Sequence, residues 1–336
     1  MSLFAFQLGT CGNRQVTGDG RGVVAGVCGV AATLAQAGEE NFPVALRLLP
    51  ARYRYHLLAV YLFARTVDDV GDRAPVAQRQ QLLADLEADL RLLYAPVSDT
   101  AAVSRAAAVS QAAAAGTSPG AGPVPGTSMR PAPTSPAVRG LAATIADRGI
   151  PMQPFIDLIE ANRQDQLVTR YETFDDLLGY CRLSANPVGR IVLHIFGAFS
   201  AERAARSDSV CTGLQLAEHW QDVAEDLRAG RVYLPGQDLR AYGCTERDLA
   251  GPPASPRLRE LMKFEVGRAR SQLDAGAPLI GSLRGAARFA VAGYVAGGRA
   301  ALAAIEAVGY DVLSATPRPR RGRTAAELLL AVARGR

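Results

Sequence analysis

The sequence predicts an all-α protein, folded as a single bundle of helices. Nine segments carry apolar residues close to the 3.6-residue period of an α-helix, and Ala, Leu, Arg and Glu, which favour helices, dominate them. Alternating runs of Val, Ile and Thr, the pattern of a β-strand, are absent from the sequence. Hydrophobic residues make up 49% and charged residues 21% of the 336 residues, so the chain is typical of a globular protein with a large core.

The predicted helices are separated by breaks that contain Pro or Gly. The sequence "DRAP" follows the first helix, "DRGIP" separates the third from the fourth, and "VYLPGQDL" and "GPPASP" separate the sixth from the seventh. The nine helices are predicted at residues 51–67, 76–94, 137–149, 152–166, 174–199, 207–229, 255–275, 284–308 and 324–334.

Three segments are predicted to lie outside the folded domain, which covers residues 38–316. Residues 96–136 are rich in Ala, Ser, Pro, Gly and Thr, so we expect a disordered insertion between two helices. Residues 1–37 are expected to be a disordered extension. Part of this extension imitates a secretory signal, but polar and Gly-rich residues precede it and its core is Gly and Ala rather than Leu. Residues 317–336 form a basic amphipathic tail.

The chain carries a net charge of +5, and almost all of its basic residues are Arg. The densest basic run is residues 318–323, and no nucleic-acid-binding motif accompanies it, so we expect no nucleic-acid partner. The tail that contains this run either docks on its own bundle or rests on an anionic membrane surface. No segment approaches 18 uninterrupted apolar residues, so the sequence predicts no membrane-spanning helix.

The five cysteines indicate a reducing compartment. They are scattered and form no C-x-x-C pair, which argues against a structural zinc site and against a disulfide framework. We therefore expect a cytoplasmic protein. The cysteines are Cys11, Cys28, Cys181, Cys211 and Cys244.

An acidic stripe continues the first predicted helix, in "VYLFARTVDDVGDR" at residues 60–73. Positions i, i+4, i+7 and i+11 of a helix share one face, which places Asp68 and Asp72 on one stripe with Tyr61 and Arg65. The alternate stripe is apolar and is predicted to face the core; it consists of Leu58, Leu62, Val67 and Val70.

A second acidic stripe follows in "QLAEHWQDVAEDLRAGRVYLP", residues 215–235, which the pattern predicts to be helical. Gln215 shares a face with Glu218, Asp222 and Asp226, and four residues of a helix rise by about 6 Å, so neighbouring carboxylates can hold the same ion. The packing side consists of Leu216, Trp220, Val223 and Leu227.

Two acidic stripes on apolar helices suit a hard cation bound together with phosphate. Mg²⁺ takes oxygen ligands, often a few carboxylates completed by water and substrate phosphates, whereas bare carboxylates at this spacing repel one another and take up protons. A solvated charged face is the simpler explanation of a single D-x-x-x-D motif, but two such clusters favour a metal–diphosphate site. Arg228 and Arg231 follow the second cluster, where they either neutralise phosphate oxygens or cap the helix. The three histidines, His56, His194 and His219, are too few for a zinc or di-iron site and receive no predicted role.

These motifs resemble the squalene/phytoene synthase family of head-to-head prenyl synthases. "ENFPVA" and "YCRLSANPVGR" are similar to the branch that makes hydroxysqualene for hopanoids, rather than to the phytoene synthases. The resemblance covers residues 38–316 and rests on residues 40–50, 61–72, 163–197, 215–235 and 309–313.

The resemblance implies one isoprenoid-synthase bundle, with the aspartate-rich helices facing each other across a central apolar cavity. It also implies two or three Mg²⁺ ions and a prenyl diphosphate substrate, without NADPH. The metal ligands would be Asp68, Asp72, Asp222 and Asp226, with Glu218 offering a further oxygen. Catalytic side chains near the reacting carbons would be Tyr61, Tyr180 and Gln215. Substrate contacts would come from Asn41, Phe42 and Arg65, and from Ala185, Val188 and Gly189 at a helix break that makes room for substrate and that Pro187 also favours.

The chain departs from the family pattern at Glu218, where the family usually carries Asn. Glutamate still offers an oxygen ligand, but it has a longer side chain and a full charge. This change would tighten metal binding, alter the position of the ions, or mark a weakened enzyme.

The implied reaction ionises presqualene diphosphate, lets the carbocation rearrange in an apolar pocket flanked by aromatic rings, and captures water to give hydroxysqualene. The released diphosphate or a pocket Tyr accepts the proton. No nicotinamide-binding fingerprint is present, which fits hydroxylation better than reductive squalene formation.

Presqualene diphosphate synthesis from two farnesyl diphosphates, and phytoene or dehydrosqualene synthesis, are alternatives. A catalytically silent binding or assembly protein is an alternative of another class. Other enzymes of the hopanoid pathway and the inner face of the plasma membrane are the partners that the resemblance suggests.

Overall fold

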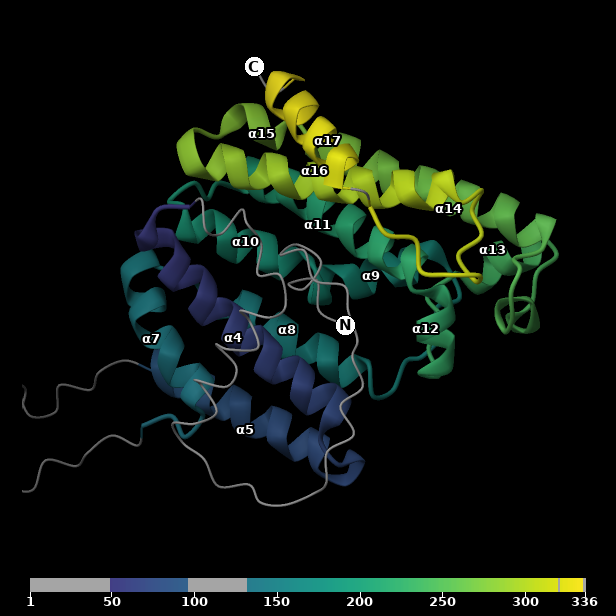
Figure 1. Cartoon of the computed structure of the whole chain (residues 1–336). Coiled ribbons are helices and arrows are strands. Elements are labelled where there is room, and N and C mark those ends of the chain that lie inside the picture. Colours follow the sequence, from purple (N-terminus) through teal and green to yellow (C-terminus); the bar gives the residue numbers. More distant parts are fainter. Residues whose placement is uncertain (1–48, 96–131, 320, 335–336) are drawn as a thin grey trace, which may run out of the picture.

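The computed structural model describes residues 49–95, 132–319 and 321–334, and these residues form helices joined by loops (Figure 1). Within this part of the chain there is no β-strand, and one isolated β-bridge pairs Arg170 with Val232. The prediction of an all-α protein is therefore confirmed. The predicted N-terminal extension and most of the predicted insertion lie outside the described residues.

The helices follow the order of the predicted segments. They are α4 (Ala51–Arg73), α5 (Val76–Tyr94), α7 (Pro136–Arg148), α8 (Gln153–Gln164), α9 (Phe174–Ser184), α10 (Asn186–Ile195), α11 (Ala201–Gln221), α12 (Val223–Arg228), α13 (Gly236–Ala241), the 3₁₀ helix η1 (Glu246–Leu249), α14 (Pro256–Gly276), α15 (Leu279–Ser282), α16 (Gly285–Ala307) and α17 (Arg321–Arg334). The short elements α13, η1 and α15 have no counterpart among the predicted helices, because four to six residues are too few to show a helical period.

Helix α11 lies at the centre of the bundle. It packs against α14 and α16 on one side and against α9 and α10 on the other, and α10 in turn contacts α4, which packs with α5, α7 and α8 (Figure 1). Because α11 has neighbours all round, every residue from Val210 to Gln221 is buried, including polar ones. Burying polar side chains costs free energy unless they form hydrogen bonds, pair with an opposite charge or bind a metal. This stretch is therefore where a functional site is expected.

The predicted helix at residues 174–199 is divided in two. Helices α9 and α10 meet at Ala185, and Pro187 lies in the first turn of α10, where its missing N–H removes no helical hydrogen bond. The predicted break is therefore confirmed, just before the proline. Helix α10 ends at Ile195, earlier than predicted, because Gly197 turns the chain with a φ of 65°.

The predicted helix at residues 207–229 is also divided, which the sequence did not indicate. It starts earlier, at Ala201, where the Ser200 side chain accepts a hydrogen bond from the Arg203 backbone at 3.2 Å. It is interrupted at Asp222, whose φ of −102° and ψ of 14° end α11, and α12 follows at once. The prediction of one continuous acidic helix from residue 215 is therefore wrong.

Helix α16 is long and apolar enough to cross a membrane by length and composition, whereas the sequence predicts no spanning helix. It packs against α11, α14 and α17, and 56% of its most apolar window is buried, as is typical of a core helix.

Helix α17 packs along α16, so the tail docks on its own bundle. The Arg288 side chain of α16 donates to the Val332 carbonyl of α17 at 3.0 Å. Leu329 and Leu330 of α17 remain exposed, and the alternative membrane contact stays a prediction.

Candidate active site

Helix α4 carries the first acidic cluster along the bundle core. Val60, Phe63 and Val67 are at most 1% exposed, and the Phe63 ring packs edge-on against Phe155 of α8 with 5.4 Å between ring centroids. The stripe predicted to face the core is thus only partly right. Val67 is buried, but the three other members are half-buried, because the most buried face of α4 is centred on Val60, Phe63 and Val67; the half-buried members are Leu58, Leu62 and Val70.

Side chains of α4 and α8 fix the first cluster. Asn162 of α8 donates through Nδ2 to Asp68 Oδ1 at 3.2 Å. Gly71 permits this approach, since a Cβ at Gly71 would lie 2.2 Å from Asn162 Oδ1. Arg65 forms an ion pair with Asp69 one turn later, with 3.2 Å between Nε and Oδ1. The predicted contact of Arg65 with a diphosphate stays a prediction.

An arginine from the opposite side of the site reaches Asp72. Arg231 follows α12, and its Nη2 lies 2.7 Å from Asp72 Oδ1. Partial burial raises the pKa of Asp72, but the surrounding positive charges together with the hydrogen bond from Arg231 outweigh this effect, so the pKa lies below its ordinary value. The Asp72 side chain is still 39% exposed, at the solvent edge of the site. The two acid-bearing segments therefore face each other.

The second cluster is buried at the junction of α11 and α12. Glu218 and Asp222 are 5% and 3% exposed, and Asp226 lies one turn further, on α12. Burial raises the pKa of Glu218 well above its ordinary value, and the charges of Asp222, Asp226 and Asp68 raise it further. Burial also raises the pKa of Asp222 to about 6 and that of Asp226 to about 7. Because Asp68 acts on Glu218, the two clusters belong to one electrostatic site.

The donor chemistry of these side chains fits Mg²⁺. Glu218 Oε2 and Asp222 Oδ1 are buried and have no hydrogen-bond partner in the described structure, and buried carboxylate oxygens suit a hard cation. As the side chains stand, no three His, Cys, Asp or Glu groups of the described residues converge closely enough to hold an ion. Two causes keep the carboxylates apart: without a cation they repel one another, and Asp72 is bound to Arg231. The donor types and their burial thus fit the metal, although the ligands are not yet arranged around one point.

A tyrosine and a further carboxylate lie between the clusters. Tyr180 of α9 is 5% exposed and donates through its hydroxyl to Asp165 Oδ2 at 2.8 Å. Burial raises the pKa of Asp165 to about 6, although the charge of Arg231 and the Tyr180 hydrogen bond act to lower it. Burial also raises the pKa of Tyr180 well above its ordinary value, so the phenol stays protonated. The pair can therefore hold and move one proton.

Several of these groups line a pocket whose empty volume, counted together with the space open to solvent, is about 450 Å³. Its polar wall comes from four helices and the end of α8, and Ala64, Leu158 and Ala161 add an apolar wall. The polar lining consists of Asp68, Asp72, Asn162, Asp165, Tyr180, Ser184 and Gln215. Four of the residues predicted for the site are therefore brought together here: Asp68, Asp72, Tyr180 and Gln215.

The predicted substrate residues at the helix break lie between helices. Ala185 is fully buried at the junction of α9 and α10, and Val188 is 1% exposed in the first turn of α10. Gly189 faces α11, where a Cβ would lie 2.3 Å from Ser207 Oγ and 2.5 Å from Cys211 Sγ. At Gly189 the structure thus shows a close approach of two helices, and the predicted substrate contact stays a prediction.

The other predicted residues are more dispersed. Tyr61 is buried on α4, and Arg228 is exposed at the end of α12, so its predicted contact with a phosphate stays a prediction. Asn41 and Phe42 lie outside the described residues.

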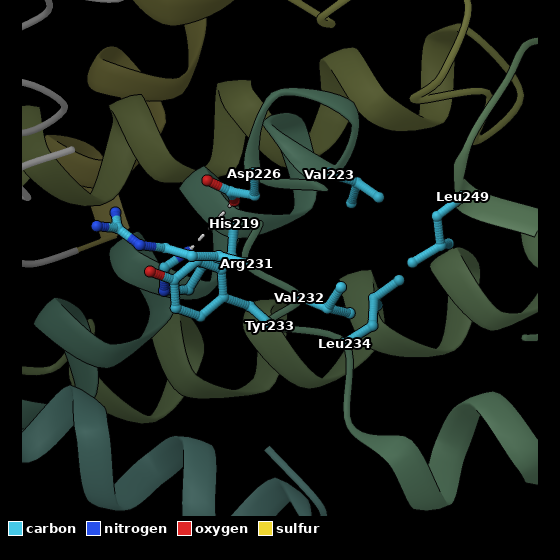
Figure 2. A pocket seen from close by; sticks show the side chains of 8 residues that line it. All are labelled: His219, Val223, Asp226, Arg231, Val232, Tyr233, Leu234 and Leu249. Atoms are coloured by element: carbon cyan, nitrogen blue, oxygen red, sulfur yellow. Dashed lines mark ion pairs between the residues drawn. The ribbon is translucent and has the colours of Figure 1, made fainter. Parts of the chain in front are cut away.

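A second, smaller pocket lies behind Asp226, with a volume of about 200 Å³ (Figure 2). Its lining includes His219, Asp226, Arg231 and Tyr233. The His219 ring stacks on the Tyr233 ring with 3.6 Å between centroids and 16° between planes. Burial lowers the pKa of His219 well below its ordinary value, so the imidazole is neutral.

Asn162, Asp165, His219 and Tyr233 lie at the site, although the sequence did not predict them there. Asn162, Asp165 and Tyr233 reach the site across a helix interface or a loop, which no spacing along one helix reveals. His219 lies one turn from Gln215 on α11, but its approach to Asp226 involves the separate helix α12. Asp165 had one available signal, since it lies within "RQDQ", at the start of a motif that carries the resemblance.

An all-α bundle that brings two acidic clusters to one site, with the first cluster lining its pocket, is typical of an isoprenoid-synthase-like protein. A family model of squalene/phytoene synthase matches residues 35–324, and the chain belongs to this family.

Known relatives are similar over most of their length. A hydroxysqualene synthase of Rhodopseudomonas palustris is 32% identical over 247 residues, which cover 73% of this chain and 72% of that protein. A hydroxysqualene synthase of Zymomonas mobilis is 35% identical over 238 residues, 70% of this chain and 68% of that protein. The crystal structure of a squalene synthase from Alicyclobacillus acidocaldarius superposes with a TM-score of 0.68 at 38% identity, covering 84% of this chain and 94% of that one.

Proposed function

We propose that this chain is a hydroxysqualene synthase, which converts presqualene diphosphate and water to hydroxysqualene and diphosphate. The observation that carries the proposal is the opposition of the two acidic clusters, with Arg231 joined to Asp72 at 2.7 Å and Asp68 acting on the buried Glu218. The hydroxysqualene synthases of two bacteria are 32% and 35% identical to the chain, which supports the choice of product.

Magnesium would supply Lewis-acid stabilisation of the negative charge on the departing diphosphate. Its ligands would be Asp68 and Asp72 on α4, and Glu218, Asp222 and Asp226 at the α11–α12 junction. Arg231 can exchange Asp72 for a phosphate oxygen, because a guanidinium binds both groups with the same geometry.

The proton of the attacking water needs an acceptor close to the carbocation. Water adds its oxygen to carbon and releases one proton, while the carbon–oxygen bond to diphosphate breaks and the electron pair leaves with the diphosphate. Tyr180 can take up this proton as it passes its own to Asp165, whose pKa of about 6 suits a base at neutral pH. The Tyr180 ring face can also stabilise the cation before water adds.

Synthesis of presqualene diphosphate from two farnesyl diphosphates is the second candidate. The same pocket could serve this reaction, since it also ionises a prenyl diphosphate, and a structure named as a squalene synthase is 38% identical to the chain. Phytoene or dehydrosqualene synthesis, and a catalytically silent member that binds other proteins, are the remaining alternatives. Glu218, in place of the usual Asn, is the feature that favours the catalytically silent alternative.

Incubation of the purified protein with Mg²⁺ and either substrate separates these candidates, with products identified by gas chromatography and mass spectrometry. An alcohol from presqualene diphosphate supports the proposal, a C30 diphosphate from farnesyl diphosphate supports the second candidate, and no turnover of either supports the silent one. The variants Asp68→Asn and Asp222→Asn are expected to reduce the rate by at least about 100-fold, since each removes a charged ligand.

The surroundings of the enzyme follow from the same proposal. Cys181 and Cys244 are buried and form no disulfide in the described part of the chain, which fits a cytoplasmic protein. A peripheral contact of α17 with the inner face of the plasma membrane, through the exposed Leu329 and Leu330, would deliver a water-insoluble product to the lipid. Other enzymes of the hopanoid pathway are candidate partners at that surface.

A further inference from the structure

His219 lies between two groups of the site. Its Nε2 is 3.1 Å from Nε2 of Gln215, one turn earlier on α11, and its Nδ1 is 3.9 Å from Oδ2 of Asp226 on α12. Figure 2 shows this second interaction as a dashed line from the imidazole to the Asp226 carboxylate. The histidine is 5% exposed. One buried ring therefore connects an amide of the substrate pocket with a carboxylate of the second acidic cluster.

The partners of the ring define which nitrogen carries its proton. The amide nitrogen of Gln215 can only donate a hydrogen bond, so Nε2 of His219 accepts it. The proton of the neutral ring is then on Nδ1, the nitrogen that faces Asp226. A separation of 3.9 Å is too long for a hydrogen bond, and a movement of about 1 Å closes it to one. Catalytic hydrogen bonds of this kind are often long before ligands bind.

The ring is held in this orientation by aromatic packing. Tyr233 stacks on it at 3.6 Å, and Tyr180 lies 6.3 Å away with 35° between the ring planes. A 180° flip of the imidazole would break both polar contacts, and a smaller rotation would also tilt the ring out of its stack with Tyr233. The amide of Gln215 is fixed as a result: its nitrogen is bound to His219, while its Oε1 is buried without a partner in the described structure, and Gln215 lines the larger pocket.

We propose that His219 is a positioning residue with two separable contacts. Through Nε2 it holds the Gln215 amide so that Oε1 faces the substrate pocket, and through Nδ1–H it orients the Asp226 carboxylate for a cation. The second contact rests on the proposed function, because the cation belongs to it. Groups that hydrogen-bond to metal ligands from behind fix their orientation, and their loss typically costs about 10- to 100-fold in metal affinity or activity.

Three variants separate the two contacts. His219→Asn keeps an N–H near the position of Nδ1, His219→Gln keeps an oxygen near the position of Nε2, and His219→Phe keeps the stacking but removes both polar atoms. The matched control is His56→Phe, which removes another buried histidine. His56 lies in the first half of α4 and is hydrogen-bonded to Thr144 of α7 at 3.0 Å. Two quantities are measured on the full chain: Mn²⁺ affinity in the presence of inorganic diphosphate, by electron paramagnetic resonance of the free ion, and kcat and KM for presqualene diphosphate.

The proposal predicts a split between the variants. His219→Phe weakens Mn²⁺ binding about ten-fold and lowers kcat. His219→Asn keeps the Mn²⁺ affinity within about two-fold but lowers kcat, whereas His219→Gln mainly loses Mn²⁺ affinity. His56→Phe changes neither quantity.

Equal losses for Asn and Gln, or wild-type Mn²⁺ affinity and kcat in His219→Phe, would indicate a packing role and overturn the proposal. If His219→Phe does not fold, the Asn and Gln pair alone decides. Wild-type protein that binds Mn²⁺ but turns over no substrate contradicts the proposed reaction, and the Mn²⁺ measurements then still test the contact with Asp226. Wild-type protein that binds no Mn²⁺ contradicts both.

Discussion

Individual side chains of the site depend on partners from other helices, and Asp165 shows this most clearly. It accepts the Tyr180 hydroxyl at 2.8 Å, and its pKa is raised to about 6 by burial. We expect Asp165→Asn to lower kcat by about 100-fold with little change in KM, because the amide cannot take up the proton that Tyr180 would pass on. The rate is measured with presqualene diphosphate at saturating Mg²⁺.

The control for this change is Asp157→Asn, on the same helix α8. Asp157 accepts a hydrogen bond from Gln153 at 2.7 Å on the exposed side of the helix, and its replacement is expected to leave the rate unchanged. If Asp165→Asn and Asp157→Asn have the same kcat, the Tyr180–Asp165 pair has no part in proton transfer.

The buried carboxyl of Glu218 can be tested as a metal ligand through its effect on stability. Its carboxyl is 5% exposed and is surrounded by Asp68, Asp222 and Asp226, which raise its pKa together with burial. Without metal, Glu218→Gln should raise the melting temperature at pH 8, because the variant buries no charge. With Mg²⁺ and diphosphate, the same variant should gain less stability than the wild type, because one anionic ligand is lost. Thermal unfolding with and without Mg²⁺ measures both effects, and an equal Mg²⁺-induced shift in the two proteins would show that Glu218 is not a ligand.

The helix elements depend on close approaches that single glycines permit. At Gly189 of α10, a Cβ would meet Ser207 Oγ at 2.3 Å and Cys211 Sγ at 2.5 Å, on the central helix α11. We expect Gly189→Ala to lower the free energy of unfolding by about 1–3 kcal/mol, as is typical when a tightly packed contact is overfilled. Chemical denaturation measures the change.

Gly179 provides the matched control on the preceding helix α9. A Cβ there would meet no atom within 4 Å, so Gly179→Ala should stabilise the protein by about 0.5–1 kcal/mol through helix propensity alone. A Gly189→Ala protein as stable as the wild type, but with altered KM, would instead support the substrate contact that the resemblance implies.

At the scale of the whole molecule, the sequence predicted the bundle and part of the site. Period 3.6 located the helices because most of the long helices bury one side more than the other, and the i, i+4 spacing placed Asp68 with Asp72 and Glu218 with Asp222. The interruption at Asp222 could not be predicted, since no Pro or Gly marks it. His219 received no role for another reason: Gln215 lies one turn away on the same helix, but the contacts with Asp226 and Tyr233 depend on how α12 and the loop after it pack against α11.

The bundle also buries one carboxyl that the site does not use, Glu265 of α14. It is 0% exposed, and its Oε1 lies 3.3 Å from Arg268 Nη1, which at the same time binds Asp238 Oδ2 at 2.6 Å. Burial raises the pKa of Glu265 to about 8; the charge of Arg268 lowers it and that of Asp238 raises it. Two carboxyl groups thus share one guanidinium, and Glu265 retains its proton at neutral pH.

This raised pKa makes stability fall with pH. Between the unfolded value near 4.5 and the folded value of about 8, the folded state binds more protons at Glu265 than the unfolded state, so the free energy of unfolding decreases as pH rises. Glu265→Gln removes that loss. The variant should therefore match the wild type near pH 5 and become progressively more stable relative to it up to about pH 8.

The single tryptophan reports the unfolding, since the Trp220 indole donates to the Glu265 carbonyl at 3.1 Å and is fully buried. Glu306→Gln, which removes a partly exposed ion pair with Arg270 between α14 and α16, should show a pH-independent difference. A Glu265→Gln protein whose stability difference from the wild type is the same at pH 5 and pH 8 would mean that this carboxyl is already ionised in the fold.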